Sequence, residues 1–152
     1  QYHFDMVRLG IGLHGISATH ANLQPVSSFK TYISSIRKVP EGQSIGYGRK
    51  SYTTRPSRIA VIPVGYADGL NRHLSNRVGN VFIKGKRVPI IGNICMDTCM
   101  IDVTDTNAAI GDEVEIFGKH ILVSELSEQL GTIPYEILTG ISHRVKRVYY
   151  KE

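Results

Sequence analysis

Short apolar segments, each ended by turn residues, recur along most of this chain and limit the folds open to it. Residues 28–39 alternate apolar and polar side chains and end at Pro40. Segments of this length, separated by Gly, Pro and Asp, are typical of strands in an all-β barrel or sandwich. Residues 81–92 predict a hairpin that turns around Gly85 and Lys86. Further strands are predicted within residues 58–64, 99–103, 112–118 and 143–150.

Only two segments indicate helices. Residues 124–131 begin at Ser124, a candidate N-cap, and end at Gly131. Residues 134–140 begin with Pro134, which suits a first helical turn. The fold class that we predict is therefore mainly β, a compact β-barrel-like domain with two short helices.

The first 25 residues differ from the rest. Residues 4–17 have the pattern of one strand that runs into a Gly-rich loop, and residues 18–25 have that of a linker. We therefore expect a boundary near Pro25. Residues 1–25 would be the end of a preceding unit, and residues 26–152 the β domain.

Composition excludes few functions but favours some. The net charge of +5 permits an acidic partner. The densest basic cluster, residues 143–151, intersperses basic with apolar residues, as the solvated face of a strand does, so we predict no nucleic-acid partner. No apolar run approaches the roughly 18 residues that a membrane span needs, and no secretory signal is recognisable. A cytoplasmic location without membrane contact is the expectation.

The two cysteines, Cys95 and Cys99, predict neither a disulfide nor a metal site. Residues four apart on a strand share a face but lie roughly 13 Å apart, too far for a disulfide. Zinc normally takes four ligands, and two thiols at this spacing are too few. We expect both cysteines to be reduced and buried.

Tyr47 stands between Gly46 and Gly48, just before Arg49 and Lys50. Glycine weakens a strand and often marks a close approach by another group. Either the phenol reaches out of the fold, or the segment is a bulged strand start. An unshifted tyrosine, with a pKa near 10, is a poor base at neutral pH, and nearby cations can lower that pKa.

Three other motifs contain candidate site residues, each with a structural alternative. Tyr66 and Asp68 end an apolar run, where they form either a plain turn or the edge of a pocket. Asp97 would lie in a buried strand, where its carboxylate needs partners. Arg8 precedes glycines whose backbone N–H groups could bind a phosphate. His143 could be a ligand or a base, although a lone histidine is more often structural.

Taken in order, these motifs resemble the C-terminal part of alanine racemase. The resemblance covers nearly the whole chain. The matching stretches are "DMVRLGIGLHGI", "GYGRKSYT", "IPVGYADGLNR", "GNICMDTCMID", "GDEVEIFG" and "SHRVKRVY".

The resemblance implies a bacterial isomerase that interconverts L- and D-alanine for peptidoglycan synthesis in the cell wall. It implies pyridoxal 5'-phosphate (PLP) as cofactor, bound by an N-terminal α/β barrel of the same protein. Residues 1–25 would be the end of that barrel. The lysine that binds the cofactor would precede this chain, so the fragment alone is expected to be inactive. Homodimers with shared active sites are implied, each β domain serving the site of the other subunit.

Residue roles follow from the same resemblance. Tyr47 matches the tyrosine base, and Arg8 the arginine that faces the pyridine nitrogen. Positions that match the remaining site residues are Gly10, Ile11 and His143 for the cofactor phosphate, Tyr66, Met96 and Asp97 for the substrate, and Arg72, Asn93 and Ile141 for the entryway.

Two positions depart from the family pattern. His143 replaces a tyrosine, and Asn93 replaces an arginine that is frequent there. A racemase for serine or another amino acid therefore stays open as an alternative. So do a basic β-barrel module that binds RNA or a protein, and a dimerisation domain whose tyrosine has lost its role.

Overall fold

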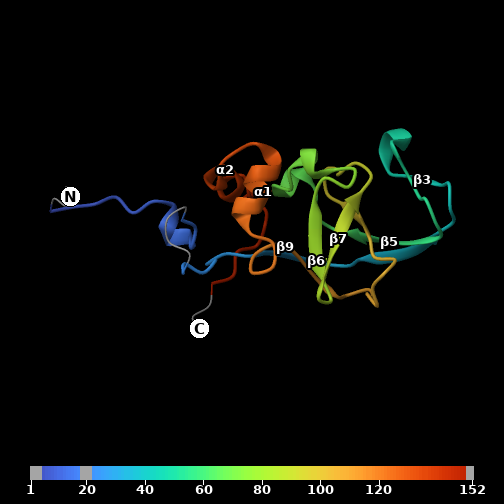
Figure 1. The fold of residues 1–152 in the computed structure, drawn as a ribbon, viewed down its shortest axis with the longest axis horizontal. Coiled ribbons are helices and arrows are strands. Elements are labelled where there is room, and N and C mark those ends of the chain that lie inside the picture. The colour runs from blue at the N-terminus through green and yellow to red at the C-terminus, as the bar shows by residue number, and fades with distance from the viewer. Residues whose placement is uncertain (1–4, 18–21, 150–152) are drawn as a thin grey trace.

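A computed structural model describes residues 5–17 and 22–149 of the chain. In these ranges, seven strands form one sheet in the order β1-β9-β6-β7-β8-β5-β2, and β3 and β4 form a separate two-stranded sheet (Figure 1). The strands are β1 (Phe29–Tyr32), β2 (Ser35–Val39), β3 (Ser44–Ile45), β4 (Ser51–Tyr52), β5 (Ser57–Ile62), β6 (Asn80–Ile83), β7 (Lys86–Ile91), β8 (Cys99–Asp102) and β9 (Glu113–Phe117). The helices are α1 (Val123–Leu130) and α2 (Pro134–Thr139), with 3₁₀ turns η1 (Ile11–His14), η2 (Tyr47–Arg49), η3 (Tyr66–Asp68) and η4 (Arg72–Leu74).

The large sheet curls because its two edge strands are consecutive in the chain. β1 pairs antiparallel with β9, and β2 pairs antiparallel with β5. Between them, the N–H of Ile33 donates to the Asp112 carbonyl at 3.0 Å, whereas the N–H of Ser34 donates to the Val61 carbonyl at 2.9 Å. One continuous strand thus changes partners between two adjacent residues and joins the two edges. The predicted β-barrel-like fold with two short helices is confirmed.

The inside of the curled sheet is filled by branched aliphatic side chains. Burying them removes apolar surface from water, which is the main favourable term in folding. Val123 and Leu126 of α1 extend this core beyond the sheet. Fully buried members include Ile33, Ile62, Ile83, Ile90, Ile101, Val81, Val103 and Val114.

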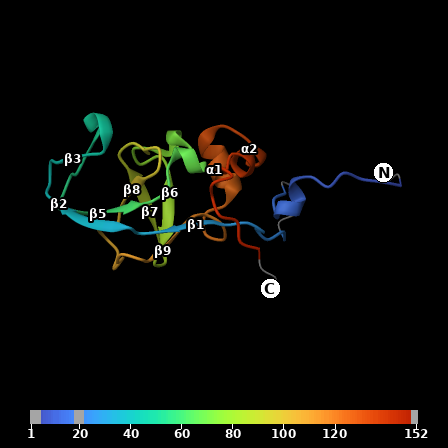
Figure 2. The ribbon, with the colours of Figure 1, turned by 180° about the vertical axis from the view of Figure 1, so that it is seen from behind.

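The helices lie at one end of the sheet, and the β3–β4 hairpin lies at the other (Figures 1 and 2). α2 begins at Pro134 as predicted, and Gly131 ends α1 with a left-handed φ of 65°. The prediction that Ser124 caps α1 was wrong. The helix starts at Val123, so Ser124 lies inside it, and Leu122 holds the cap position without a side-chain bond.

The hairpin of β6 and β7 turns one residue earlier than predicted. Ile83 pairs with Lys86, which leaves Lys84 and Gly85 as a two-residue loop. Their φ values of 47° and 78° are both positive, as a tight hairpin turn with the twist of the strands requires.

Two predicted strands are not formed in the described ranges. Residues 142–149 contain no strand, because Arg144 and Arg147 fold back to bond acidic side chains and backbone carbonyls. Residues 5–10 also contain none, and Leu9 is 71% exposed. A strand needs a neighbour for its backbone hydrogen bonds, and this segment extends away from the sheet (Figure 1). Residue 4, residues 18–21 of the predicted linker, and residue 150 lie outside the described ranges.

No helix in residues 5–17 and 22–149 has the length and apolar character that crossing a bilayer requires. The longest, α1, has 8 residues.

Ile33→Ala should test the closure of the sheet. Ile33 is 0% exposed where the strand changes partners. Removing most of its side chain leaves a cavity, so we expect the free energy of unfolding to fall by about 2–5 kcal/mol. Tyr32→Ala is the matched control, because Tyr32 is 56% exposed, and it should cost at most about 1 kcal/mol. Denaturant unfolding of both variants measures the difference, and equal losses would contradict this role of Ile33.

Candidate functional site

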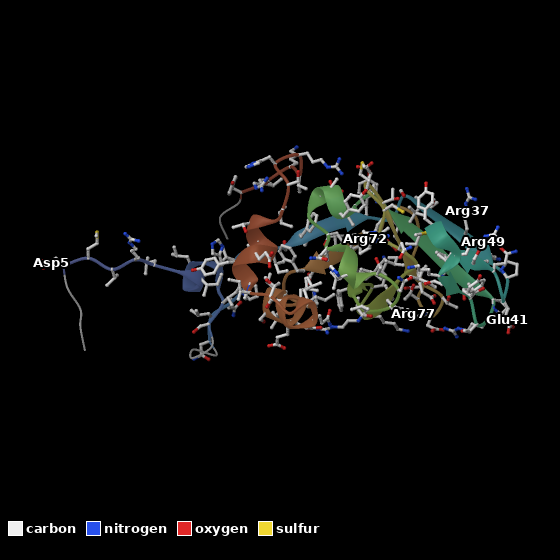
Figure 3. All side chains as sticks on the ribbon, turned by 90° about the horizontal axis from the view of Figure 1, so that it is seen from above. Asp5, Arg37, Glu41, Arg49, Arg72 and Arg77 are labelled. Atoms are coloured by element: carbon white, nitrogen blue, oxygen red, sulfur yellow. The ribbon has the colours of Figure 1, made fainter. Side chains whose placement is uncertain are left out.

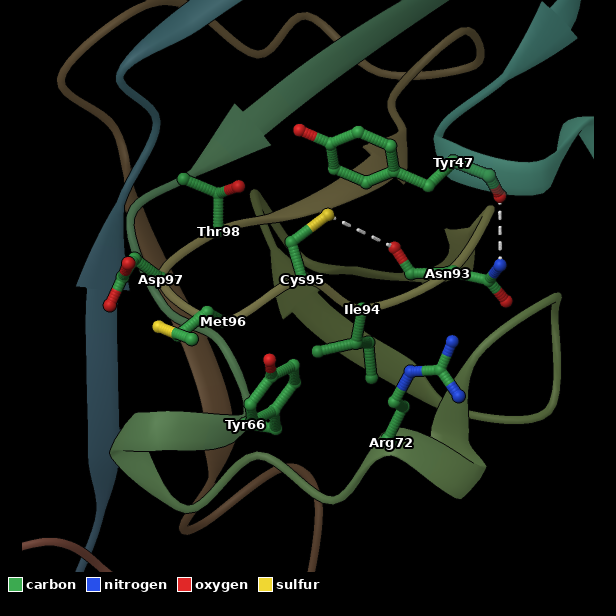
Figure 4. A pocket seen from close by; sticks show the side chains of 9 residues that line it. All are labelled: Tyr47, Tyr66, Arg72, Asn93, Ile94, Cys95, Met96, Asp97 and Thr98. Carbon is green, nitrogen blue, oxygen red and sulfur yellow. Dashed lines mark hydrogen bonds between the residues drawn. The ribbon is translucent and has the colours of Figure 1, made fainter.

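An open hollow of ≈ 460 Å³ lies between three loops of the β domain (Figure 4). Six residues singled out from the sequence line it together, although they come from distant parts of the chain. The lining residues are Tyr47, Tyr66, Arg72, Asn93, Ile94, Cys95, Met96, Asp97 and Thr98.

Tyr47 reaches the hollow from the loop between β3 and β4. Gly46 and Gly48 on either side have φ values of 73° and 77°, which residues with a Cβ rarely adopt. A Cβ on Gly46 would also lie 3.1 Å from the Met100 Cε atom. The side chain of Tyr47 is 78% exposed. The two glycines therefore form a turn that presents the phenol instead of packing it.

Tyr66 and Met96 are brought together by backbone hydrogen bonds. The N–H of Tyr66 donates to the Cys95 carbonyl, and the N–H of Ala67 to the Met96 carbonyl, both at 3.0 Å. The approach is so close that a Cβ on Gly65 would collide with both carbonyl groups. These bonds fasten η3 to the loop that precedes β8.

Arg144 joins this pair of loops to a third segment. Its Nε donates to Asp68 at 2.7 Å, and its terminal nitrogen donates to Asp97 at 2.6 Å. The Asp68 and Asp97 carboxylates raise the pKa of Arg144 above its ordinary value. The second oxygen of Asp68 accepts from the N–H of Gly65 at 2.8 Å. One guanidinium thus joins two of the loops around the hollow, those that carry Asp68 and Asp97, to its own segment.

Arg144 was not predicted individually as a site residue, and the predicted position of Asp97 was wrong. Arg144 stood within the predicted final strand, and only its presence in the quoted stretch "SHRVKRVY" marked it. Asp97 was expected in a buried strand, but β8 begins at Cys99 and the Asp97 side chain is 61% exposed. Its observed partner is a guanidinium.

The two cysteines differ in environment. Cys99 is fully buried as expected, and burial raises the pKa of its thiol to about 12, because burial disfavours the thiolate. Cys95 is half-buried and lines the hollow, contrary to the expectation for it, and its Sγ contacts the Asn93 carbonyl at 3.6 Å. Neither forms a disulfide. In the ranges described, no group of three or more His, Cys, Asp or Glu residues is arranged to hold a metal ion.

Five of the singled-out residues lie away from the hollow. Ile141 packs behind η3, where a Cβ on Gly69 would lie 3.0 Å from its Cδ1. His143 is exposed in the turn next to Arg144. Arg8, Gly10 and Ile11 lie on the N-terminal segment.

The N-terminal segment and the Tyr47 loop occupy opposite ends of the molecule. Figure 3 shows Asp5 at one end, and Arg49, which belongs to η2 with Tyr47, at the other. Within one copy of this chain, Arg8 and Tyr47 therefore cannot face the same ligand.

Comparisons with known proteins agree on one family. Residues 26–149 match the family model described as alanine racemase, C-terminal domain. The chain is 49% identical to alanine racemase 2 of Caldanaerobacter subterraneus subsp. tengcongensis over 97% of its own length. It is 46% identical to alanine racemase of Methanococcus maripaludis, also over 97% of its length. The chain spans 40% and 42% of these two relatives.

Solved structures give the same result. The chain is similar to alanine racemase from a D-cycloserine producing Streptomyces lavendulae, with a TM-score of 0.90, 33% identity, and coverage of 99% of this chain and 42% of that one. It is also similar to alanine racemase from Bartonella henselae with covalently bound pyridoxal phosphate. There the TM-score is 0.88 and the identity 38%, with coverage of 93% of this chain and 40% of that one.

Arg144→Met should loosen the loops around the hollow. It leaves Asp68, whose side chain is 13% exposed, without its cation, so we expect a lower melting temperature. Arg144→Lys keeps the positive charge and should restore part of the lost melting temperature. The rescue should be incomplete, because an ammonium group cannot match the planar guanidinium that bonds two carboxylates. Arg55→Met is the matched control, since Arg55 pairs with Asp105 on the open surface. The melting temperature of this variant should be close to that of the wild type. Thermal unfolding measures all three, and equal melting temperatures for the two Met variants would contradict the role of Arg144.

Proposed function

Because this chain belongs to the family of alanine racemase C-terminal domains, we propose that the full-length protein interconverts L- and D-alanine. In this proposal the chain contributes Tyr47 as one of two bases that act on opposite faces of the substrate α-carbon. The product would serve peptidoglycan synthesis in the cytoplasm. The observation that carries the proposal is the exposed phenol of Tyr47 above a hollow lined by five other residues that match family site positions.

Tyr47 is suited to hold and release a proton at the α-carbon. Its phenol is accessible, and the turn between Gly46 and Gly48 fixes the backbone from which it projects. A base works well when it is positioned within hydrogen-bond reach of the proton that it takes. The base for the other face would come from the part of the full-length relatives that this chain does not span.

The residues proposed for the cofactor carry chemical groups that can bind PLP. Arg8 offers a permanent cation for the pyridine nitrogen. Gly10 and Ile11 lie where η1 begins. The first backbone N–H groups of such a turn have no acceptor within it, so they can donate hydrogen bonds to a phosphate group. His143 is exposed and can donate to a phosphate oxygen. When bound, PLP withdraws electrons from the α-carbon and so makes its proton removable.

A homodimer would complete each site. The N-terminal segment, which carries Arg8, and the Tyr47 loop lie at opposite ends of one chain, as Asp5 and Arg49 mark in Figure 3. A site that uses both Arg8 and Tyr47 must therefore take them from two copies. We therefore propose head-to-tail pairing, in which the Tyr47 loop of one subunit enters the cofactor site of the other. The N-terminal barrel of the same protein would be the further partner.

The hollow accommodates a small amino acid. We propose that the backbone N–H of Met96 donates to the substrate carboxylate, with Tyr66 beside it and Asp97 at the edge. Arg72, Asn93 and Ile141 would shape the approach. The hydrogen bonds between residues 66–67 and 95–96 hold this side of the hollow in place.

Tyr47→Phe in the full-length protein should slow interconversion strongly but leave proton exchange at one face of the substrate. Removing a positioned base costs about 10²–10⁴-fold in rate. We expect racemisation to fall by that factor, while the α-proton of D-alanine still exchanges with solvent deuterium at the other base. Chiral chromatography measures conversion, and proton NMR in deuterium oxide measures exchange.

Tyr52→Phe is the matched control for this test. Tyr52 is 54% exposed on β4, close in sequence to Tyr47, but does not line the hollow. Its variant should racemise alanine at the wild-type rate. Unchanged racemisation by Tyr47→Phe would remove the proposed base. If the wild type racemises serine and not alanine, the proposed substrate changes, but the proposed site residues do not.

A further inference from the structure

The loop that presents Tyr47 is held by a short hairpin. β3 and β4 have two residues each and form a sheet of their own, with Ser44 opposite Tyr52 and Ile45 opposite Ser51. A two-stranded hairpin is marginal by itself even when it is longer. The position of Tyr47 over the hollow therefore depends on contacts between this loop and the barrel.

Asn93 makes the polar contact to Tyr47 itself. Its Nδ2 donates to the Tyr47 backbone carbonyl at 2.8 Å (Figure 4). A Cβ on Gly46 would lie 3.5 Å from the Asn93 backbone nitrogen, and one on Gly48 would lie 3.8 Å from its Nδ2. Asn93 thus lies against the turn on both sides of Tyr47.

A chain of hydrogen bonds fixes the orientation of the Asn93 amide. The Ser51 hydroxyl donates to Asn76 Oδ1 at 2.7 Å, and Asn76 Nδ2 donates to Asn93 Oδ1 at 3.0 Å. A backbone carbonyl can only accept, so the last bond requires Asn93 Nδ2 to face Tyr47. Asn93 Oδ1 then faces Asn76, which must donate. The chain therefore runs in one direction, and no amide in it can turn over without losing a bond.

Asn76 is itself held by the backbone. Its N–H donates to the Gly92 carbonyl at 3.0 Å, and its φ of 57° lies in the left-handed region, where asparagine and aspartate are enriched. Ser51 lies on β4, so the chain starts and ends on the hairpin that carries Tyr47. It crosses the barrel loops in between.

We propose that Asn93 is the positioning residue of Tyr47 and that Asn76 sets the orientation of its amide. The inference rests on the proposed role of Tyr47 as a base. The amide at position 93 both accepts from Asn76 and donates to Tyr47, whereas a lysine or arginine there can donate but not accept. Loss of either asparagine moves the phenol relative to the substrate without touching the reacting atoms.

Two variants of the full-length protein test this inference. Asn93→Ala removes the donor to Tyr47. Asn76→Asp keeps the acceptor for Ser51 and tolerates the positive φ at this position. An aspartate carboxylate can only accept, so it can bond Asn93 only if the Asn93 amide turns over. That rotation takes Asn93 Nδ2 away from the Tyr47 carbonyl. Asn107→Ala is the control, because Asn107 is exposed in the loop between β8 and β9 and does not line the hollow.

The expected effect is restricted to one face of the substrate. A misplacement of about 1 Å can cost about 10²-fold in rate. In both variants, deuterium exchange at the α-carbon of L-alanine, and racemisation with it, should fall by about 10- to 100-fold. Exchange of D-alanine, which would use the other base, and the KM for alanine should stay within about twofold of the wild type. Asn107→Ala should match the wild type in every assay.

A double variant separates positioning from other roles. If Asn93 acts only through Tyr47, then Asn93→Ala combined with Tyr47→Phe should lose no more than Tyr47→Phe alone. Independent of activity, amide hydrogen exchange of residues 43–54 should become faster in Asn93→Ala and Asn76→Asp but not in Asn107→Ala. Additive losses or unchanged amide exchange would overturn the inference.

The outcomes also separate this inference from the proposed function. If Tyr47→Phe abolishes L-alanine exchange and Asn93→Ala does not reduce it, the inference fails and the proposed function stands. A raised KM with unchanged kcat would mean that Asn93 binds the substrate, and equal losses for both enantiomers would mean a general loosening; each overturns the positioning role. Full activity of Tyr47→Phe removes the proposed base, and this inference with it.

Discussion

The change of partner between Ile33 and Ser34 is the constraint on which the rest of the fold depends. A strand that pairs with β9 through its first half and with β5 through its second half brings the two edges of one sheet together. The curled sheet then encloses a core of aliphatic side chains. Its two edge strands, β1 and β2, follow each other directly in the chain. The ends of β5, β7 and β8 are thereby fixed in place, and the loops that form the hollow follow from them.

The loops themselves are held by three kinds of bond. Backbone hydrogen bonds fasten residues 65–67 to residues 95–96, where the absence of a Cβ on Gly65 allows the close approach. The Arg144 guanidinium bridges two carboxylates from separate loops. Side-chain amides connect the Tyr47 turn to the barrel. The first two kinds hold the side of the hollow proposed for the substrate, and the third holds the proposed base.

This division suits a chain that contributes only part of an active site. The N-terminal segment, which carries Arg8, Gly10 and Ile11, lies at the end of the molecule opposite to the Tyr47 loop, as Asp5 and Arg49 mark in Figure 3. A rigid barrel between them would set the distance at which two copies must pair. In the proposed dimer, the 78% exposure of Tyr47 would let its phenol enter the cofactor site of the other copy.

Local sequence patterns were enough to predict most strands of the barrel, both helices and the family. Alternating apolar residues and turn signals located the strands of the barrel, glycine and proline located the ends of the helices, and the ordered motifs indicated the family before any coordinates. The sequence also selected Tyr47, Tyr66, Arg72, Asn93, Met96 and Asp97, which the fold brings to one hollow. Tertiary structure alone decided that residues 29–39 divide between two partners, that residues 5–10 and 142–149 form no strand, and that Arg144 and Asn76 support the site. The reason is physical: strand pairing, ion pairs and amide orientation depend on groups that lie far apart in the sequence, which local periodicity does not encode. Asn76 and Asn93 are 17 residues apart, and Asp68 and Arg144 are 76 residues apart.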